Sequence, residues 1–293
     1  MANLKEIRTR IASVNSTRQI TSAMKMVSAA KLRRAQDTIL QMRPYANKLH
    51  EILSHISGAV EIAQDNLYAQ NREKKNILII AVSSNRGLCG AFNSNVFRKL
   101  YNLLCNDFAV QYRNKTVDII CIGRKVADLC KSKQIHVKET YHELFDQLSF
   151  DNIVPVAESV MKSFASKSYD QVIFVYNQFK NAAVQLLTVE NFLPISMEEQ
   201  KNASVYKSDY IFEPNRNFIV DVLIPKSLKI QFYKVLLDSN ASEQGARMTA
   251  MHKATDNASD MLHSLRINYN KARQFAITNE ILEIVGGAEA LKG

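Results

Sequence analysis

Two long segments at opposite ends of the chain carry the feature that most constrains the fold. Residues 3–43 contain neither glycine nor proline, and no proline follows Pro225. In both segments apolar residues recur at alternating spacings of three and four, the pattern of a coiled-coil seam. This spacing predicts a helix from about residue 3 to Arg43, ended by Pro44 and roughly 60 Å long. It predicts a second helix from about Lys226 to Val285, on the order of 90 Å long.

The first seam changes character in its middle. Its apolar members lie toward the two ends: Leu4, Ile7, Ile11, Val14, Leu32, Ala35, Ile39 and Met42. Between them the same frame falls on Arg18, Thr21, Lys25 and Ser28. Ile20, Met24 and Val27 lie one position off this frame, and the remaining apolar surface is expected to come from them.

The second seam is narrow and rich in small residues. Its members are Met248, Met251, Ala258, Leu262, Leu265, Tyr269, Ala272 and Ala276. Two long helices with narrow seams most simply pair with one another as an antiparallel coiled coil. The alanines of this seam would let the two backbones approach closely.

The middle of the chain has a different pattern. Three unbroken apolar runs, Asn76–Val82, Val117–Ile122 and Gln171–Tyr176, suit strands covered on both faces. Helix-like segments separate them, at about Asn93–Cys105, Arg124–Ser132 and Val156–Ser166, and Ala183–Glu190 suits an edge strand. This alternation predicts an α/β fold: a central Rossmann-like α/β domain plus the long antiparallel coiled coil. The expected division is 1–60, 74–195 and 210–293, with a loop at Ser196–Tyr210.

Composition indicates a folded, helix-rich chain in a reducing compartment. Only 8 Gly and 5 Pro occur in 293 residues, which favours long uninterrupted elements. The four cysteines show no CxxC spacing, so we expect free thiols and no metal site. The longest purely apolar run, ILIIAV, is too short to cross a bilayer, and the N-terminus lacks an apolar signal-peptide core. We therefore expect a cytosolic protein, or one attached to a membrane by a partner.

The net charge of +10 lies mainly in the N-terminal arm. Residues 1–50 hold ten Lys and Arg against two acids, Glu6 and Asp37. A nucleic-acid partner is one reading of this charge. The arm has no aromatic residue before Tyr45, however, and its bases are interspersed with seam residues, which argues against nucleic acid.

The segment SSNRGLCGAFN, Ser83–Asn93, follows an expected strand and opens an expected helix. Phosphate is often bound at this place in α/β proteins. The segment has Gly87 and Gly90 but lacks the third glycine of a dinucleotide fingerprint and the Lys-Ser/Thr of a P-loop. We interpret both glycines as parts of a tight structural turn. With no HExxH or GxSxG motif either, the sequence predicts no catalytic residue and no cofactor.

Three blocks resemble the gamma subunit of F-type ATP synthases. They are Ile7–Gln36, Ser83–Asn93 and Ser242–Leu291, and YIFEP at Tyr210–Pro214 is also similar. The resemblance implies a bacterial rotor shaft whose coiled coil turns inside a ring of alpha and beta subunits, near the epsilon subunit and the c-ring. It also implies that the shaft performs no chemistry. Its expected place is the cytoplasmic face of the inner membrane, peripheral and held through partners only.

The resemblance also implies contact residues. Positions matching rotor-stator contacts in the family are Met24, Lys25, Arg247, Gln274 and Thr278, and Arg273 beside them is a further candidate. A turning shaft cannot bury a wide apolar stripe against its sleeve, because a 400 Å² patch would create a well of about 10 kcal/mol. On this hypothesis the polar middle of the first helix keeps contacts with the sleeve shallow, while Ile11, Val14, Ile20 and Val27 face the partner helix.

The chain lacks the inserted segment and regulatory cysteine pair of chloroplast-type members, so thiol control is not expected. Two alternatives remain open. An α/β enzyme with helical arms would bind nucleotide at Ser83–Asn93, which calorimetry on the isolated chain would detect. A basic coiled-coil protein would bind DNA with a steep salt dependence.

Overall fold

The computed structural model describes residues 4–57, 67–70, 72–195 and 216–290. Its two longest elements are α1 (Leu4–Ser57, 54 residues) and α7 (Arg216–Ala290, 75 residues). The chain forms two compact units: a helical unit, Met1–Ser28 with Arg247–Gly293, and a sheet unit, Ala29–Ala246. Each long helix therefore contributes to both units. The three-segment division expected above stays a prediction, because the two units divide both helices.

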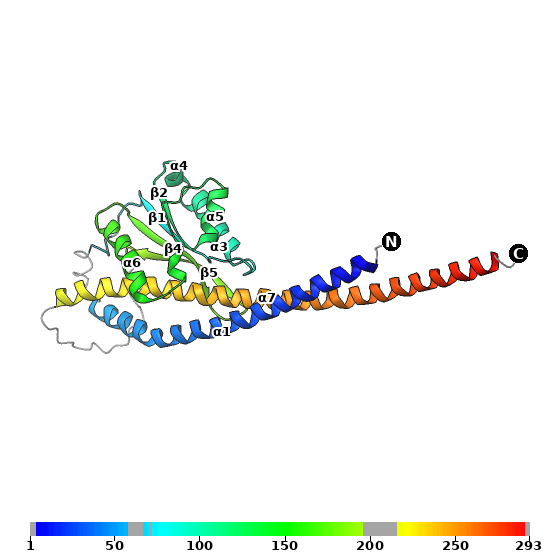
Figure 1. Ribbon diagram of the computed structural model, residues 1–293. Helices are drawn as coiled ribbons and strands as arrows, with labels where there is room; N and C mark the ends of the chain where they lie inside the picture. The colour runs from blue at the N-terminus through cyan, green and yellow to red at the C-terminus, as the bar shows by residue number, and fades with distance from the viewer. Residues whose placement is uncertain (1–3, 58–66, 71, 196–215, 291–293) are drawn as a thin grey trace. The chain divides into compact units, whose positions relative to one another are not determined.

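The sheet unit contains a five-stranded sheet of order β3-β2-β1-β4-β5. The first four strands in this order run parallel, and β5 pairs antiparallel with β4 (Figure 1). Its elements in chain order are β1 (Ile77–Val82), α3 (Phe92–Asn102), η1 (Leu103–Asp107), α4 (Ala109–Arg113), β2 (Val117–Ile122), α5 (Arg124–Ser132), β3 (Glu139–Tyr141), η2 (Glu143–Phe145), α6 (Phe150–Ala165), β4 (Gln171–Phe179) and β5 (Gln185–Leu193). This is the predicted Rossmann-like α/β fold.

Both faces of the sheet are covered, because successive residues of a strand point to opposite sides. Leu78 and Ile80 of β1 pack in one core with α6 and with the part of α7 that includes Leu228 and Phe232. Ile77 and Ile79 pack in a second core with α3, η1 and α5. This two-sided burial explains why the strands are continuous apolar runs in the sequence.

A hydrogen-bonded carboxylate joins the sheet to α7. Tyr176 of β4 donates from its hydroxyl to Glu190 Oε2 of β5 at 2.6 Å. Gln231 of α7 donates from Nε2 to Glu190 Oε1 at 2.8 Å. Burial and this carboxylate both raise the pKa of Tyr176 above its ordinary value. Glu190 thus ties two strands and one helix of the sheet unit together.

The predicted helix ends at the two prolines were wrong. Pro44 lies inside α1 and Pro225 lies inside α7. A proline inside a helix costs about 3 kcal/mol, because it removes a hydrogen bond and crowds the preceding turn. Burial of one large aliphatic side chain contributes about 1.5–3 kcal/mol. Ile39 and Leu49 flank Pro44 and are buried, as Ile224 and Leu228 are around Pro225, so packing on both sides keeps each helix continuous.

Most of the predicted strands and helices of the middle segment are found within a few residues, but α4 was not predicted and the helix expected from Val156 begins at Phe150, with Pro155 inside it. β2 and α5 have the predicted bounds, and the expected edge strand is β5. The three-residue β3 was missed, because ETY carries no apolar run. The helix expected at Asn93–Cys105 ends at Asn102 and continues as the π-helix η1. The loop expected at Ser196–Tyr210 lies outside the described residues.

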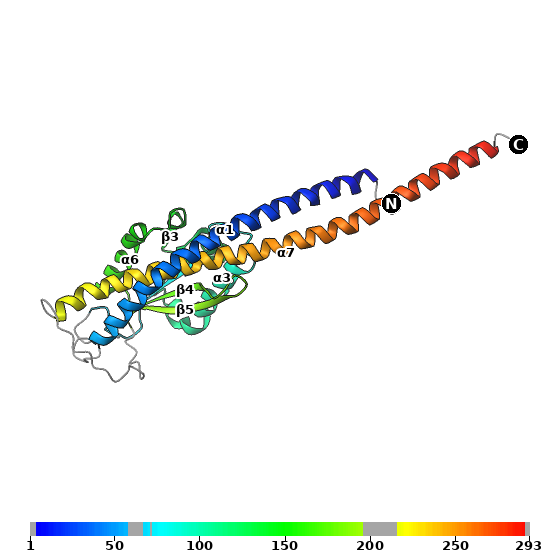
Figure 2. The same ribbon diagram turned by 90° about the horizontal axis from the view of Figure 1, so that it is seen from below.

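In the helical unit, the N-terminal part of α1 and the C-terminal part of α7 lie side by side (Figures 1 and 2). Thr255 Oγ1 donates to Thr21 Oγ1 at 2.9 Å, and Arg8 Nη2 donates to the Tyr269 hydroxyl at 2.8 Å. Because the residue number on α7 rises as that on α1 falls, the helices are antiparallel. The predicted coiled-coil pairing of the two ends of the chain is therefore confirmed.

Candidate functional site

The inward line of α1 in the helical unit is polar through its middle. Thr21 and Ser28 are buried, and Arg18 and Lys25 are half-buried. Thr21 Oγ1 also donates to the carbonyl of Arg18 at 3.0 Å. The seam frame continues unchanged through this polar stretch, with small hydroxyl side chains where a coiled coil usually has aliphatic ones.

The expectation that Ile20 and Val27 face the partner helix was wrong. Their side chains are 60% and 56% exposed, and Met26 beside them is 62% exposed. The apolar seam on either side of this stretch fixes which face of α1 points inward. Of the three apolar residues one position off the frame, Ile20 and Val27 are exposed and Met24 is half-buried. This segment therefore has a polar contact line and an apolar outer line.

The opposing line of α7 matches most of the predicted seam. Met251, Ala258 and Leu262 are buried. Leu265, Tyr269 and Ala272 are half-buried, but Ala276 is exposed. Figure 1 shows the reason, since α7 continues past the N-terminal end of α1 and has no partner helix there. The side chains of the last turns of α7 are exposed on every side of the helix.

The six predicted contact residues occupy three settings. Met24 and Lys25 are half-buried on α1, and Arg247 is 8% exposed on α7. Arg273, Gln274 and Thr278 are exposed on α7. Thr278 Oγ1 donates to the carbonyl of Gln274 at 2.9 Å, so its hydroxyl is partly satisfied within its own helix. Their contact with another subunit stays a prediction.

The structure does not bring these residues into a single patch. The Thr21–Thr255 pair places Met24 and Lys25 beside the part of α7 just before Thr255. Arg273, Gln274 and Thr278 follow Tyr269, which pairs with Arg8 near the start of α1. At 1.5 Å per residue, the two groups lie roughly 30 Å apart along the helix axis. They can therefore serve two separate contacts at two heights of the helical unit.

Side chains of the segment Ser83–Asn93 hold this turn together and cap α5, the helix that follows β2. The first amides of α5 are occupied: Arg124 N donates to Asn85 Oδ1 at 3.2 Å and Val126 N donates to Ser83 Oγ at 3.1 Å. Ser84 N likewise donates to Asn93 Oδ1 at 3.0 Å. These contacts give the segment a structural role, as expected for a tight turn, while α3, the helix that the segment opens, has no side-chain cap.

Of the two glycines predicted in this turn, only Gly90 has a left-handed backbone, with φ 61°. Such a conformation favours glycine. A Cβ on Gly87 would meet no atom within 4 Å, so steric crowding does not require glycine there. Gly123 was not singled out from the sequence, although its φ is 99° and a Cβ there would lie 2.2 Å from the Ser83 carbonyl oxygen.

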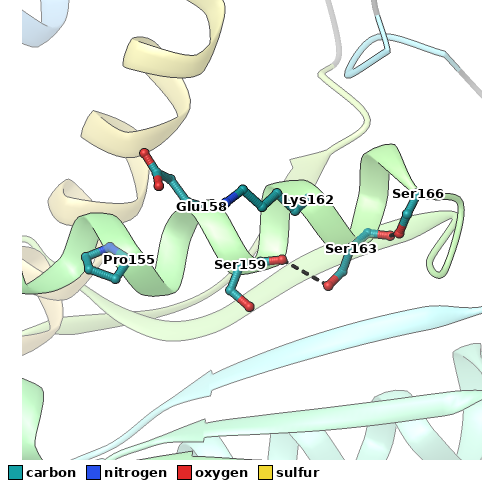
Figure 3. A pocket seen from close by; sticks show the side chains of 6 residues that line it. All are labelled: Pro155, Glu158, Ser159, Lys162, Ser163 and Ser166. Atoms are coloured by element: carbon teal, nitrogen blue, oxygen red, sulfur yellow. Dashed lines mark hydrogen bonds between the residues drawn. The ribbon is translucent and has the colours of Figure 1, made fainter.

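A shallow hollow lies on the surface of α6 (Figure 3). It is lined by Pro155, Glu158, Ser159, Lys162, Ser163 and Ser166. The Ser163 hydroxyl donates to the carbonyl of Ser159 at 2.9 Å, and Glu158 accepts from Lys229 Nζ at 2.6 Å. The lining residues come from α6 and from Ser166 directly after it, so no second element brings ligand groups to the hollow.

In the part of the chain that the structure describes, no three His, Cys, Asp or Glu side chains gather closely enough to hold a metal ion. No helix among those residues has both the length and the hydropathy to cross a bilayer. All four cysteines are free thiols, and only Cys105 is exposed.

The comparisons with known proteins agree along the whole chain. The family described as ATP synthase matches residues 3–291. An ATP synthase gamma chain from Flavobacterium johnsoniae is 55% identical, with 100% of both chains covered. Another, from Cytophaga hutchinsonii, is 53% identical over 99% of both chains.

Solved structures share the fold. A chain of the Euglena gracilis mitochondrial ATP synthase, in an OSCP/F1/c-ring structure, superimposes with a TM-score of 0.68 at 23% identity, covering 98% of this chain and 94% of that one. A chain of the central stalk and c-ring structure from Tetrahymena thermophila gives 0.61 at 24% identity, covering 80% of this chain and 99% of that one. A long helix pair carrying a Rossmann-like domain defines the class. The chain belongs to the family of ATP synthase gamma chains.

Proposed function

We propose that this chain is the central rotor shaft of a bacterial F-type ATP synthase. In this role, rotation of an ion-driven c-ring turns the shaft, and the shaft drives the catalytic beta subunits through their conformational cycle. The observation that carries the proposal is the antiparallel pairing of α1 and α7 in the helical unit, in a chain of this family. Such a pair is long, narrow and stiff, as torque transmission requires.

The shaft itself is proposed to be non-catalytic. Support comes from the segment Ser83–Asn93, whose Ser83 and Asn85 side chains cap α5 and whose Asn93 side chain accepts from Ser84 N, so these polar groups serve the fold. Catalysis then belongs to the surrounding alpha and beta subunits. The further proposed partners are the epsilon subunit and the c-ring. Through them the chain would be peripheral to the cytoplasmic face of the inner membrane.

The proposed rotor-stator contacts lie at two heights. Met24 and Lys25, next to the exposed Ile20 and Val27, form the lower set on α1. Arg273, Gln274 and Thr278 form the upper set on the exposed end of α7. Arg247 is also proposed as a contact, and its burial in this chain means that contact needs a side-chain rearrangement. Only differential contacts between rotary states can couple shaft angle to nucleotide affinity.

The Met24→Lys variant tests this proposal. A second cation beside Lys25 adds a charged contact to the sleeve, so ATP-driven proton pumping per ATP hydrolysed should fall in membrane vesicles. Thermal unfolding of the isolated chain should change little, because Met24 is only half-buried and a lysine there can keep its aliphatic stem in contact and its ammonium group in solvent. The matched variant Met24→Leu keeps an apolar side chain and should keep coupling. Normal pumping efficiency in Met24→Lys would contradict the assignment of Met24.

A tagged full-length chain provides the complementary test of the role itself. Extracted gently from membranes, it should bring down alpha, beta and epsilon subunits. If the chain were recovered alone while ATPase activity remained elsewhere in the extract, the proposed rotor-shaft role would be contradicted.

A further inference from the structure

Gly245 lies in the middle of α7, where a glycine is unfavourable. Glycine in a helix interior costs about 1 kcal/mol relative to alanine, so its presence in a continuous helix needs a packing reason. A Cβ on Gly245 would lie 3.1 Å from the carbonyl oxygen of Ala182 and 3.3 Å from its Cα. Ala182 belongs to the turn between β4 and β5. The backbone of α7 therefore lies directly against the backbone of this hairpin at Gly245.

The turn of the β4–β5 hairpin is held by its own hydrogen bonds. Asn181 Oδ1 accepts from the amides of Ala183 at 3.0 Å and Val184 at 2.7 Å. The Asn181 amide donates to the Val184 carbonyl at 3.2 Å. Gln185 Nε2 donates to the Ala182 carbonyl at 3.1 Å. Because an asparagine side chain that binds nearby backbone amides fixes a turn locally, the hairpin presents a stiff tip to α7.

The same hairpin holds α7 at a second place. Gln231 Nε2 donates to Glu190 Oε1 at 2.8 Å. Beside it, the Phe232 ring packs against Phe174 of β4 and Phe192 of β5, at centroid distances of 5.1 Å and 5.8 Å. Phe232 is fully buried, so this second attachment is part of the core that α7 shares with the sheet.

The two attachments lie on one face of α7 at different heights. Gln231 and Gly245 are two heptads apart in the sequence, so they share a face of the helix. Their separation along the helix axis is about 21 Å. Between them Val235, Asp238 and Ser242 continue the same three-four spacing, and all three are buried. This face of α7 is therefore covered along its whole length from one attachment to the other.

β5 runs along this face of α7. The chain from Ala182 to Glu190 is about 27 Å long when extended, enough to reach between the two attachments. β5 lies beside α7 in both views (Figures 1 and 2). A twist of α7 by about 20° would move an atom at its surface, about 5 Å from the axis, by about 1.7 Å. Because that movement would break the Gln231–Glu190 hydrogen bond, the two attachments together resist twisting.

We propose that the β4–β5 hairpin is a splint that keeps α7 from twisting relative to the sheet, and that Gly245 positions the helix against it. Gly245 is the last residue but one of the sheet unit along α7, which continues into the helical unit at Arg247. The inference rests on the proposed rotor-shaft function, in which torque between the sheet and the shaft loads α7 at this place. The splint makes the sheet and its part of α7 turn as one body.

The contact at Gly245 is tested first in the isolated full-length chain. In Gly245→Leu the added side chain meets the Ala182 backbone and displaces the hairpin tip, although leucine favours the helix more than glycine does. Amide hydrogen exchange at Ala183 and Val184 should become about tenfold faster or more, because local opening then costs less. The matched control is Gly87→Leu, since a Cβ there meets no atom within 4 Å, and it should leave this exchange unchanged.

The mechanical role is tested in the assembly. The chain is biotinylated at the exposed Cys105, reconstituted with alpha and beta subunits, and observed through an attached bead while catalysis is stalled. The angular variance of the bead measures how easily the shaft twists. It should rise about twofold or more in Gly245→Leu, because one of two attachments is lost, and keep the wild-type value in Gly87→Leu. Gln231→Leu removes the other attachment without adding bulk at the hairpin tip, and it should raise the variance as well.

A wild-type angular variance in Gly245→Leu would overturn the proposal, even with faster exchange at the hairpin, and Gly245 would then be an ordinary packing glycine. If Gly245→Leu does not fold, the variance of Gln231→Leu decides in its place. A wild-type chain that forms no rotating assembly with alpha and beta would contradict the rotor shaft, and the splint would fall with it. The two failures are distinguishable, because only the second is seen in the wild type.

Discussion

At the residue scale, Gly123 shows how a single position keeps the sheet unit in register. Its backbone is left-handed, and it directly precedes α5, whose first amides are capped by Ser83 and Asn85. The same backbone brings Gly123 N within 2.8 Å of the Tyr141 carbonyl, which links β2 to β3. One glycine thus positions a helix start and an edge strand together.

We expect Gly123→Ala to be severely destabilising. The added Cβ would lie 2.2 Å from the Ser83 carbonyl oxygen, which is backbone and cannot move aside cheaply. Overpacking together with a strained φ should lower the free energy of unfolding by roughly 3 kcal/mol or more. Gly87→Ala is the matched control, because a Cβ there meets nothing within 4 Å. Urea unfolding of both variants decides the matter, and equal losses would show that the turn tolerates repacking.

Tyr176 makes the free energy of unfolding depend on pH. Burial, and then the Glu190 carboxylate, raise its pKa in the folded state. The unfolded chain releases this proton near pH 10, so the unfolded state binds fewer protons above that pH and stability falls as pH rises. This contribution is fully present below about pH 10.

Replacing Tyr176 by Phe should therefore make the protein less sensitive to alkali. Relative to the wild type, its free energy of unfolding should fall by about 1 kcal/mol less between about pH 9 and about pH 11. The other tyrosines with raised pKa values are present in both proteins, so the comparison isolates Tyr176. Parallel pH profiles in urea unfolding would show that Tyr176 does not carry this linkage.

At the element scale, the long helices show what the sequence can and cannot predict. Three-four spacing correctly identified α1, α7 and their antiparallel pairing, because an apolar line at this spacing is buried when a second helix packs along it. It failed at Pro44 and Pro225, because local propensity cannot measure the burial of Ile39, Leu49, Ile224 and Leu228 on either side. The strand runs were readable because both sheet faces are covered, whereas the short and exposed β3 had no such signal.

The candidate contacts were less predictable. The sequence correctly placed the polar residues Thr21 and Ser28 on the buried seam. It also predicted that Ile20 and Val27 face the partner helix, whereas both side chains are exposed. The prediction relied on the apolar character of these two side chains. The side of α1 on which they lie is decided by the seam positions of the neighbouring turns. The hydroxyl pair between Thr21 and Thr255 joins helices 234 positions apart, and no local pattern indicates it.

Truncation after Thr278 tests the end of α7 as a separate element. The described residues beyond Thr278 are almost entirely exposed, so their removal takes away little buried surface. We expect thermal unfolding of the truncated chain to stay close to the wild type, while proton pumping per ATP hydrolysed falls or assembly weakens. A large loss of stability would mean that the terminal turns support the fold of the helical unit.

At the scale of the whole molecule, the proposed function rests on the helical unit. Thr21 and Ser28 of α1 are buried there, whereas Ile20, Met26 and Val27 are exposed. The hypothesis that the middle of the first helix turns its polar groups toward the sleeve and its apolar groups toward the partner helix is therefore wrong. The rotor-shaft proposal depends on α1 and α7 of the helical unit acting as a single body.

A disulfide across the helix pair tests that dependence most directly. The Thr21 and Thr255 hydroxyl oxygens lie 2.9 Å apart, so Thr21→Cys with Thr255→Cys, in a Cys105→Ser background, should form a disulfide within the shaft. If the two helices turn as one body, ATP-driven rotation of the oxidised assembly, observed on single molecules, should match that of the reduced assembly. Rotation that stops on oxidation and returns on reduction would show that the helices must move past one another, and would contradict the account.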